Sequence, residues 1–267
     1  MEQYYQSIIL GIIQGIGEFL PISSSGHLVL VPWIFDWKEQ GLSFDVALHM
    51  GTLVAVILYF WRDWMNIFAK AFGGSFEDGN AVSGMEINRN MLWILAIATI
   101  PGVLSGLFLE EIVETTLRNP LIIAFNLFFW GLILYLADTR SRNIEKINKV
   151  SFLDGVIIGL AQAVAIIPGT SRSGITMSAG LLRGLSRADA ARFSFLMLTP
   201  IVFGASILKF NELFASFGTE MLIGLIFSVA SGYLSIKYLI KFIGRVSYKV
   251  FFWYRLALAI LIVLLYI

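Results

Sequence analysis

The chain has 267 residues, of which 58% are hydrophobic and only 14% are charged, and its mean hydropathy is +0.81. Soluble domains carry about 25% charged residues, so this composition excludes a soluble globular enzyme and indicates a polytopic membrane protein. The net charge of +1 gives no basic field for nucleic acid, and the absence of cysteine excludes thiol catalysis, thiolate metal sites and disulfides.

Residues 1–6 are polar and lack the basic segment and cleavage site of a signal peptide, so we expect none to be removed. Beyond them, several apolar runs approach the roughly 20 residues that a transmembrane helix needs. These runs are Phe44–Trp61, Met91–Leu109, Leu121–Ala137, Phe193–Phe210, Met221–Ile240 and Val250–Ile267. The sequence therefore predicts an all-α polytopic membrane protein with six transmembrane helices.

Two further apolar stretches are too short to cross. Ile8–Leu20 is followed by Pro-Ile-Ser-Ser-Ser-Gly-His and by Leu28–Phe35, and Gly155–Ile167 is followed by Pro-Gly-Thr-Ser-Arg-Ser-Gly and by Ile175–Leu182. A helix of about 13 residues rises only about 20 Å, against a hydrocarbon core of about 30 Å. We expect each stretch to form a re-entrant helix–loop–helix hairpin that enters and leaves on one face of the membrane.

The chain also repeats itself. A shift of 148 residues pairs Gln14 with Gln162 and Ser23 with Ser171. Each half then holds one hairpin and three spans, and because three is odd the second half begins on the opposite face. We expect one membrane domain, residues 1–267, built as a 3+3 inverted repeat of residues 1–143 and 144–267. Inverted repeats with broken helices place a site near the midplane, where the hairpin tips meet.

Basic residues predict the orientation. If the first hairpin opens to the outside, the inner loops hold 14 Lys and Arg residues and the outer segments hold three. This bias follows the positive-inside rule and predicts a multi-pass protein of the plasma (inner) membrane. Arg255 lies near the inner end of the last span, where we expect it to extend to the membrane interface.

The first cluster of candidate functional residues lies on the first hairpin. Gln14 and Glu18 are four residues apart and share one helix face, and a glutamate at membrane depth usually marks a functional site. His27 follows Glu18 by nine residues. Between them lie three hydroxyl side chains, those of Ser23, Ser24 and Ser25. The alternative is structural, with Glu18 capping or pairing within the bundle.

The second cluster is Pro168–Thr176. The guanidinium of Arg172 suits phosphate, Gly169 lets the backbone approach a ligand, and the helix that follows presents free N–H groups. Hydroxyl groups surround Arg172, on Ser171, Ser173 and Thr176. This pattern predicts a polyanion site. The alternative is a buried Arg172–Glu18 pair that pins the hairpins together.

Other polar residues in the spans rank lower. Asp45 and His49 are four residues apart on one helix, and we expect Asp45 to cap that helix. Asn126 is a lone polar residue in a span and is expected to join two helices.

Both clusters resemble the motifs of a known family. Gln14-x-x-x-Glu18 resembles [E/Q]xxxE, and Pro168–Thr176 resembles PGxSRSxxT, of the undecaprenyl pyrophosphate phosphatases, integral-membrane enzymes linked to bacitracin resistance. The resemblance covers the whole chain. It implies hydrolysis of undecaprenyl pyrophosphate to undecaprenyl phosphate, which recycles the lipid carrier for peptidoglycan and so supports cell-wall biogenesis and cell shape. It also implies a divalent cation, Mg²⁺ or Ca²⁺, and an active site that faces outside.

The resemblance assigns roles to single residues. It makes Glu18, Ser24, His27 and Arg172 catalytic and places Glu18 and Gln14 at the metal, although the neutral amide of Gln14 makes a poor direct ligand. With the loop glycine and hydroxyls added, the expected substrate-binding set is Ser23, Ser25, Gly169, Ser171, Arg172, Ser173 and Thr176. Two attacking groups stay open: Ser24 activated by His27, or a water activated by Glu18 or His27.

Two rival functions share parts of this pattern. A type 2 phosphatidic acid phosphatase also has SGH and SR elements, but it needs a histidine after SR, and both histidines here precede it. A lipid-phosphate transporter or flippase would suit the inverted repeat. The expected partners are a polyprenyl pyrophosphate lipid and the bilayer, without nucleic acid, and a homodimer is the oligomeric state to test.

Overall fold

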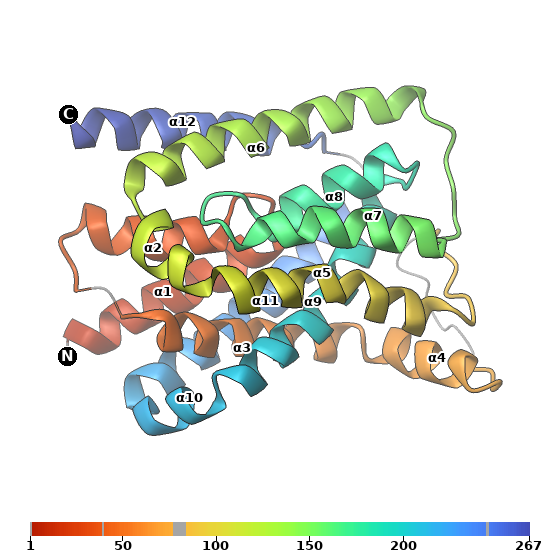
Figure 1. Cartoon of the computed structure of the whole chain (residues 1–267), viewed down its shortest axis with the longest axis horizontal. Coiled ribbons are helices and arrows are strands. Elements are labelled where there is room, and N and C mark those ends of the chain that lie inside the picture. The colour runs from red at the N-terminus through yellow and green to blue at the C-terminus, as the bar shows by residue number, and fades with distance from the viewer. Residues whose placement is uncertain (1, 39, 77–83, 244–245) are drawn as a thin grey trace.

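The computed structural model describes residues 2–38, 40–76, 84–243 and 246–267. Across these residues the chain is helical and forms no strand (Figure 1). Six helices are long and apolar enough to cross a membrane. They are α3 (Leu42–Tyr59), α5 (Met91–Ile112), α6 (Pro120–Arg140), α9 (Arg187–Leu208), α11 (Thr219–Ile243) and α12 (Lys249–Tyr266). The predicted all-α protein with six candidate membrane spans is confirmed.

Six further helices and three single turns lie in the rest of the described chain. The helices among them are α1 (Glu2–Phe19), α2 (Ser24–Ile34), α4 (Trp61–Ala71), α7 (Phe152–Ala163), α8 (Arg172–Leu182) and α10 (Phe210–Ser216). Three single turns complete them: a π-helical turn, Val113–Leu117, and two 3₁₀ turns, Ser141–Asn143 and Val164–Ile166.

Some helices extend beyond the apolar runs because polar residues cap them. The helix α9 begins at Arg187, six residues before the predicted run, since the Ser186 hydroxyl accepts a hydrogen bond from the Asp189 amide at 3.1 Å. The helix α7 begins with a capping box, in which Ser151 and Asp154 each bind the other's backbone amide.

Two helix pairs meet head to head near the centre of the molecule. The pair α1–α2 opens toward the end that carries both termini, and α7–α8 opens toward the opposite end (Figure 1). The two pairs contact each other where their helices join: the Ser173 hydroxyl donates to the Leu20 carbonyl at 3.2 Å. The loops that the sequence expects to meet therefore do meet.

Small residues bring these pairs close to the long helices. A Cβ atom on Gly11 of α1 would lie 2.3 Å from the Gly224 carbonyl oxygen of α11. A Cβ atom on Gly159 of α7 would lie 2.5 Å from the Ala98 carbonyl oxygen of α5. Side chains at either glycine would force the helices apart, so both crossings depend on backbone-to-backbone packing, as is common between membrane helices.

Candidate functional site

Glu18, in the last turn of α1, is the centre of a polar cluster between the two loops. Its Oε1 accepts hydrogen bonds from Nη2 and Nε of Arg172, at 3.0 and 3.2 Å. Its Oε2 accepts from the Ser24 hydroxyl at 2.6 Å and from the Gln14 amide at 3.1 Å. The Glu18 side chain is only 5% exposed. The carboxylate therefore links α1, α2 and α8, and the sequence-based alternative of an Arg172–Glu18 ion pair describes a contact that is present.

His49 of α3 joins this cluster, and the sequence reasoning missed it. Its Nε2 lies 3.4 Å from Oε2 of Glu18. Its Nδ1 lies 2.7 Å from the Asp45 carbonyl oxygen, which can only accept, so Nδ1 carries the proton. Nε2 faces Glu18 and can donate to it only when the ring is doubly protonated. A histidine inside a predicted span was the available signal, but only the packing of α3 on α1 brings it to Glu18.

Asp45 has a different role from the predicted helix cap. The residue at the cap position of α3 is Gly41, which has no side chain to cap with, and the Asp45 carboxylate instead contacts Nη1 of Arg118 at 3.1 Å. The capping prediction is therefore wrong.

Arg172 is held from both sides. Besides Glu18, its guanidinium donates through Nη1 to the Ser194 carbonyl of α9 at 2.7 Å. Thr176, one turn further on α8, donates to the Arg172 carbonyl at 2.7 Å and lies 2.7 Å from the Ser194 hydroxyl. Thr176 thus fixes the backbone that carries Arg172, and the Arg172 side chain keeps 12% of its surface exposed.

Each of the two loops contains one serine with a strained backbone conformation. Ser23 has φ +74° and Ser171 has φ +73°, in the left-handed region that non-glycine residues rarely adopt. Each hydroxyl accepts from the amide three residues on, Gly26 or Gly174, at 3.3 or 3.1 Å. Each also lies near a second serine hydroxyl, Ser25 at 3.4 Å or Ser173 at 3.3 Å. Strain of this kind, which costs about 1–3 kcal/mol per residue, is concentrated at functional sites.

His27 does not contact the Ser24 hydroxyl that it was expected to activate. Its Nδ1 lies 2.7 Å from the Ser23 carbonyl oxygen and its Nε2 lies 2.7 Å from the Tyr254 hydroxyl. Both ring nitrogens are therefore engaged, and the Ser24 hydroxyl donates to Glu18. Within the described residues, no Ser24–His27 dyad forms.

A cavity of about 310 Å³ opens beside the cluster. Five of the expected site residues line it, namely Glu18, Ser24, Ser25, Ser171 and Arg172, and His49 joins them. The other expected residues lie behind this wall: Gln14, Ser23, His27, Gly169, Ser173 and Thr176. The rest of the lining is mostly apolar and comes mainly from α3, α5, α9 and the turn Val164–Ile166; its polar members are Ser105, Glu110, Gln162 and Lys209.

The cavity extends from the loops to the end of the molecule that carries the termini, where α5 and α9 end (Figure 1). Lys209 and Glu110 line this outer part and form an ion pair, and Lys209 also contacts Glu212 at 3.0 Å. Burial alone would lower the pKa of Lys209, but its hydrogen bonds to the two glutamates outweigh burial and raise it. The outer part of the cavity therefore carries charged side chains that are paired with each other.

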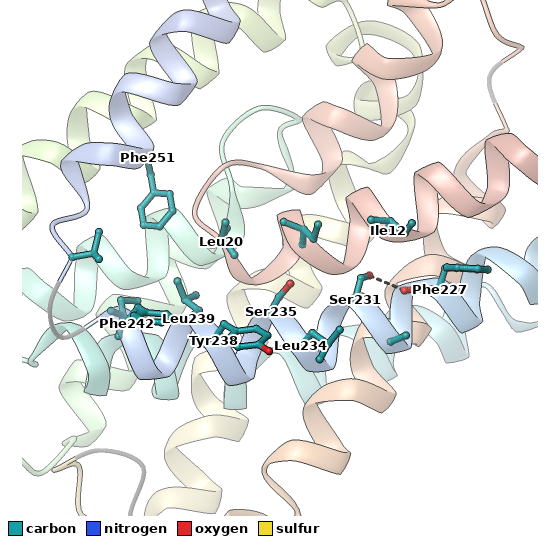
Figure 2. A pocket seen from close by; sticks show the side chains of 14 residues that line it. Ile12, Leu20, Phe227, Ser231, Leu234, Ser235, Tyr238, Leu239, Phe242 and Phe251 are labelled. Carbon is teal, nitrogen blue, oxygen red and sulfur yellow. Dashed lines mark hydrogen bonds between the residues drawn. The ribbon is translucent and has the colours of Figure 1, made fainter.

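A second, apolar groove of about 680 Å³ lies on the opposite face of α1, against α11 and the start of α12 (Figure 2). Ile12 and Ile16 line it from α1, Leu20 from the loop after α1, and Tyr238 and Phe242 from α11. Among its lining residues there is no Lys, Arg, Asp or Glu. The described part of the groove therefore has hydroxyl groups but no charged group for a phosphate, and α1 separates it from Glu18.

A divalent cation would find few protein ligands at the cavity floor. Among the described residues no group of three His, Asp or Glu side chains could hold a metal. Glu18 is the carboxylate there, and it already pairs with Arg172. Oε1 of Gln162, which lines the cavity, and Oε1 of Gln14 are buried without a hydrogen-bond partner. This donor set fits a cation that takes its other ligands from a bound substrate.

Gly169 and two residues expected to be structural hold the second loop. Gly169 has φ +89°, and a Cβ atom there would lie 2.7 Å from the Ile123 carbonyl oxygen, so the glycine allows the loop to approach α6. Asn126 of α6 donates to the Pro168 carbonyl at 3.2 Å. Arg255 is fully buried and donates to the Gly169 carbonyl at 2.7 Å. The prediction that Arg255 extends to the membrane interface is therefore wrong.

Comparison with known proteins identifies relatives along nearly the whole chain. The model of the family "bacitracin resistance protein BacA" matches residues 7–261. The undecaprenyl-diphosphatase of Desulforudis audaxviator is 47% identical over 263 residues, which cover 98% of this chain and 97% of the relative. The undecaprenyl-diphosphatases of Moorella thermoacetica and Pelotomaculum thermopropionicum are 47% and 44% identical, over 97% and 98% of this chain and 96% of each relative.

Proposed function

Because the chain belongs to the bacitracin resistance protein BacA family, we propose that its Glu18–Arg172 cluster hydrolyses undecaprenyl pyrophosphate to undecaprenyl phosphate and inorganic phosphate. The protein is a membrane-embedded undecaprenyl-diphosphatase, the activity for which its relatives are named. The observation that carries the proposed site is the set of Glu18, Ser24, His49 and Arg172 at the floor of one cavity.

The cavity matches the two parts of the substrate. Arg172, the hydroxyls of Ser25 and Ser171, and the N-terminus of α8 would hold the pyrophosphate, because guanidinium and free amides bind phosphate oxygens. The apolar walls from α3, α5 and α9 would hold the first prenyl units. A bound pyrophosphate would compete with Glu18 for Arg172 and would free the Glu18 carboxylate to accept a proton.

Two routes of attack fit this geometry. In the first, the Ser24 oxygen attacks the terminal phosphorus, its proton passes to Glu18 over the existing 2.6 Å hydrogen bond, and undecaprenyl phosphate leaves. Water then hydrolyses the phosphoserine. In the second, Glu18, with His49 beside it, takes the proton of a water that attacks the same phosphorus. His27 supports either route by holding the Ser23 carbonyl.

A divalent cation, Mg²⁺ or Ca²⁺, completes the proposed site. When bound it would neutralise the charge of the pyrophosphate. Glu18 would contribute its carboxylate, and Gln14 would orient Glu18 from behind. Since the protein supplies few ligands, we expect the cation to bind with the substrate.

We also propose that the chain is a 3+3 inverted repeat of residues 1–143 and 144–267, with α1–α2 and α7–α8 as re-entrant hairpins. The packing supports this, because α1 packs on α11 while α7 packs on α5, the second span of the other half in each case. The first spans, α3 and α9, also contact each other, as do the third spans, α6 and α12. The matched glycines Gly11 and Gly159, and the matched strain at Ser23 and Ser171, fit the same relation.

The orientation in the membrane is part of the proposal. Both the α1–α2 pair and the outer part of the cavity point toward the end with the termini (Figure 1). The basic loops lie at the other end, so the cavity would open to the outside of the plasma membrane. The expected homodimer stays a prediction.

Phosphate release by purified protein tests the activity. We expect inorganic phosphate from undecaprenyl pyrophosphate, and loss of this release when a chelator removes divalent cations. A lipid transporter with the same architecture would move a labelled lipid across proteoliposomes without releasing phosphate. A phosphoserine trapped at Ser24 on rapid acid quenching would select the serine route over the water route.

A further inference from the structure

Two consecutive residues of α12, Tyr254 and Arg255, contact both helix pairs of the site. The Tyr254 hydroxyl lies 2.7 Å from Nε2 of His27, on the first helix pair. Nη2 of Arg255 donates to the carbonyls of Gly169 and Thr170, on the second, at 2.7 and 3.0 Å. We propose that Tyr254 and Arg255 form a clamp that fixes the two loops relative to each other and thereby positions Glu18 against Arg172. This inference rests on the proposed function of that pair.

The Tyr254 side of the clamp has a defined chemistry. Because the Ser23 carbonyl can only accept, Nδ1 of His27 carries the proton, so the neutral ring presents a lone pair at Nε2. The Tyr254 hydroxyl donates to that lone pair, and the two rings stack with 5.8 Å between centroids and an interplanar angle of 8°. His27 is thereby fixed in one tautomer and one orientation. Through it, Tyr254 sets the Ser23 carbonyl, next to the Ser24 that binds Glu18.

The Arg255 side is a buried cation without a carboxylate partner in the described chain. Its guanidinium is fully buried and donates to four backbone carbonyls, those of Asn126, Leu127, Gly169 and Thr170. Nη1 has no hydrogen-bond partner. A buried charge of this kind has a large desolvation cost, which is offset here by the dipoles of two α6 carbonyls and two carbonyls of the second loop.

The consequence for the site is electrostatic as well as geometric. Arg255 binds two of the loop carbonyls, whose negative dipoles would otherwise disfavour an anion held by Arg172 and the first amides of α8. The positive Arg255 also lies beneath the start of α8, since its Nη1 would be 3.2 Å from a Cβ on Gly174. Both effects favour a polyanion at the loop.

Tyr254 and Arg255 are positioning residues, because neither lines the cavity. The two helix pairs also contact each other directly, through Ser173 and Leu20 and through Arg172 and Glu18. Anchoring both loops to one turn of α12 removes their freedom to slide past each other. Since reacting groups must be held within a fraction of an ångström, a displacement of about 1 Å costs about a hundredfold in rate.

The test compares Tyr254→Phe with a matched control, Tyr266→Phe, on the same helix at an exposed position. The Tyr254 variant keeps the stacked ring and loses the hydroxyl. We expect its kcat for undecaprenyl pyrophosphate to fall about tenfold, the scale of one hydrogen bond, with KM within about twofold and thermal unfolding in detergent nearly unchanged. The control should match the wild type in all three. Unchanged kcat in Tyr254→Phe would overturn the clamp.

A double-mutant cycle separates positioning from general stability. If Tyr254 acts through His27, then Tyr254→Phe should have no further effect on kcat in a His27→Ala background. Additive losses would show that the hydroxyl acts elsewhere and would overturn the proposal.

For Arg255 we expect Lys to retain more kcat than Met, since Lys keeps the charge that faces the carbonyls. Equal kcat in Arg255→Lys and Arg255→Met, with both folded, would contradict the Arg255 side of the clamp. Failure of the proposed function looks different, because the wild-type protein itself would then release no phosphate in the same assay.

Discussion

Glu18 and Arg172 lie 154 residues apart in the chain, yet Oε1 of Glu18 is 3.0 Å from Nη2 of Arg172 in the wall of a cavity. The same carboxylate also accepts hydrogen bonds from Ser24 and Gln14. Without substrate, Arg172 pairs with Glu18, which is the one carboxylate on the cavity floor among the described residues. We therefore expect a pyrophosphate that displaces Glu18 from Arg172 to be bound by Arg172 and, in the same exchange, to free the Glu18 carboxylate to accept a proton.

Arg172→Ala should lose most activity while the protein stays extractable and folded. The guanidinium is the cation that faces the cavity floor, and loss of one charged group that stabilises a developing phosphate charge costs about 10²–10³-fold in kcat. Arg172→Lys should recover only part of this loss, because an ammonium cannot form the forked contact. Phosphate release measures both. Arg142→Ala, at an exposed position in the 3₁₀ turn Ser141–Asn143, is the control. Near-wild-type turnover in Arg172→Ala would contradict the assignment.

Glu18→Gln should abolish turnover and flatten the dependence on divalent cation, because the amide neither accepts a proton nor binds a metal strongly. Gln14→Ala should be milder, since Gln14 lies behind Glu18 and donates one hydrogen bond to it. Phosphate release across a titration of Mg²⁺ or Ca²⁺ compares the two. A larger loss in Gln14→Ala would show that the metal position has been assigned to the wrong residue.

His49→Ala should lower kcat about tenfold, and His49→Gln should lower it less. The Nε2 atom faces Oε2 of Glu18 at 3.4 Å. Since Nδ1 donates to the Asp45 carbonyl, Nε2 can donate to Glu18 only when the ring is doubly protonated. Alanine removes this donor, a loss on the scale of one hydrogen bond. A glutamine can present its amide to the same oxygen. Steady-state kinetics of the purified variants measure this. Wild-type kcat in His49→Ala would mean that His49 only packs against the cluster.

The sequence was sufficient to predict the features that depend on residues close together in the chain, namely the membrane spans and the two loops. Length and hydropathy identified the six spans, and the Ser-Ser-Ser-Gly-His and Ser-Arg-Ser-Gly segments marked both loops. His49 and Tyr254 could not be assigned to the site in this way, because each reaches it only through packing between helices distant in the chain. Arg255 was placed at the interface from its distance to the end of the span. It is the seventh residue of α12, about 9 Å into the helix, and carbonyls of a neighbouring loop offer it a nearer partner.

Asp154→Asn should destabilise the protein at neutral pH. Burial alone would raise the pKa of Asp154, but hydrogen bonds from Ser151 and the contact with Arg183 lower it below its ordinary value. A carboxylate whose pKa is lower in the folded state stabilises the fold above the unfolded-state pKa and loses that contribution as pH falls through the folded-state pKa. We expect a loss of about 1 kcal/mol, typical of a helix cap. The difference from wild type should narrow in acid.

Thermal unfolding in detergent at neutral and acid pH measures this effect. Glu145→Gln removes a carboxylate at an exposed position and should leave the unfolding temperature unchanged. A gap between Asp154→Asn and wild type that widens in acid would reverse the sign and refute the capping role.

The last prediction concerns the face on which the chemistry takes place. Ser25 lines the cavity, and the chain has no cysteine, so Ser25→Cys supplies a single thiol at the site. If the cavity opens outside, a membrane-impermeant thiol reagent added to intact cells should label it, and inorganic pyrophosphate should protect it. Lys38→Cys and Asn143→Cys, both exposed, are the controls for the proposed outer and inner faces. Labelling of Ser25→Cys only in inverted vesicles, together with Asn143→Cys, would place the cavity mouth on the cytoplasmic side and favour a carrier or an inward-facing phosphatase.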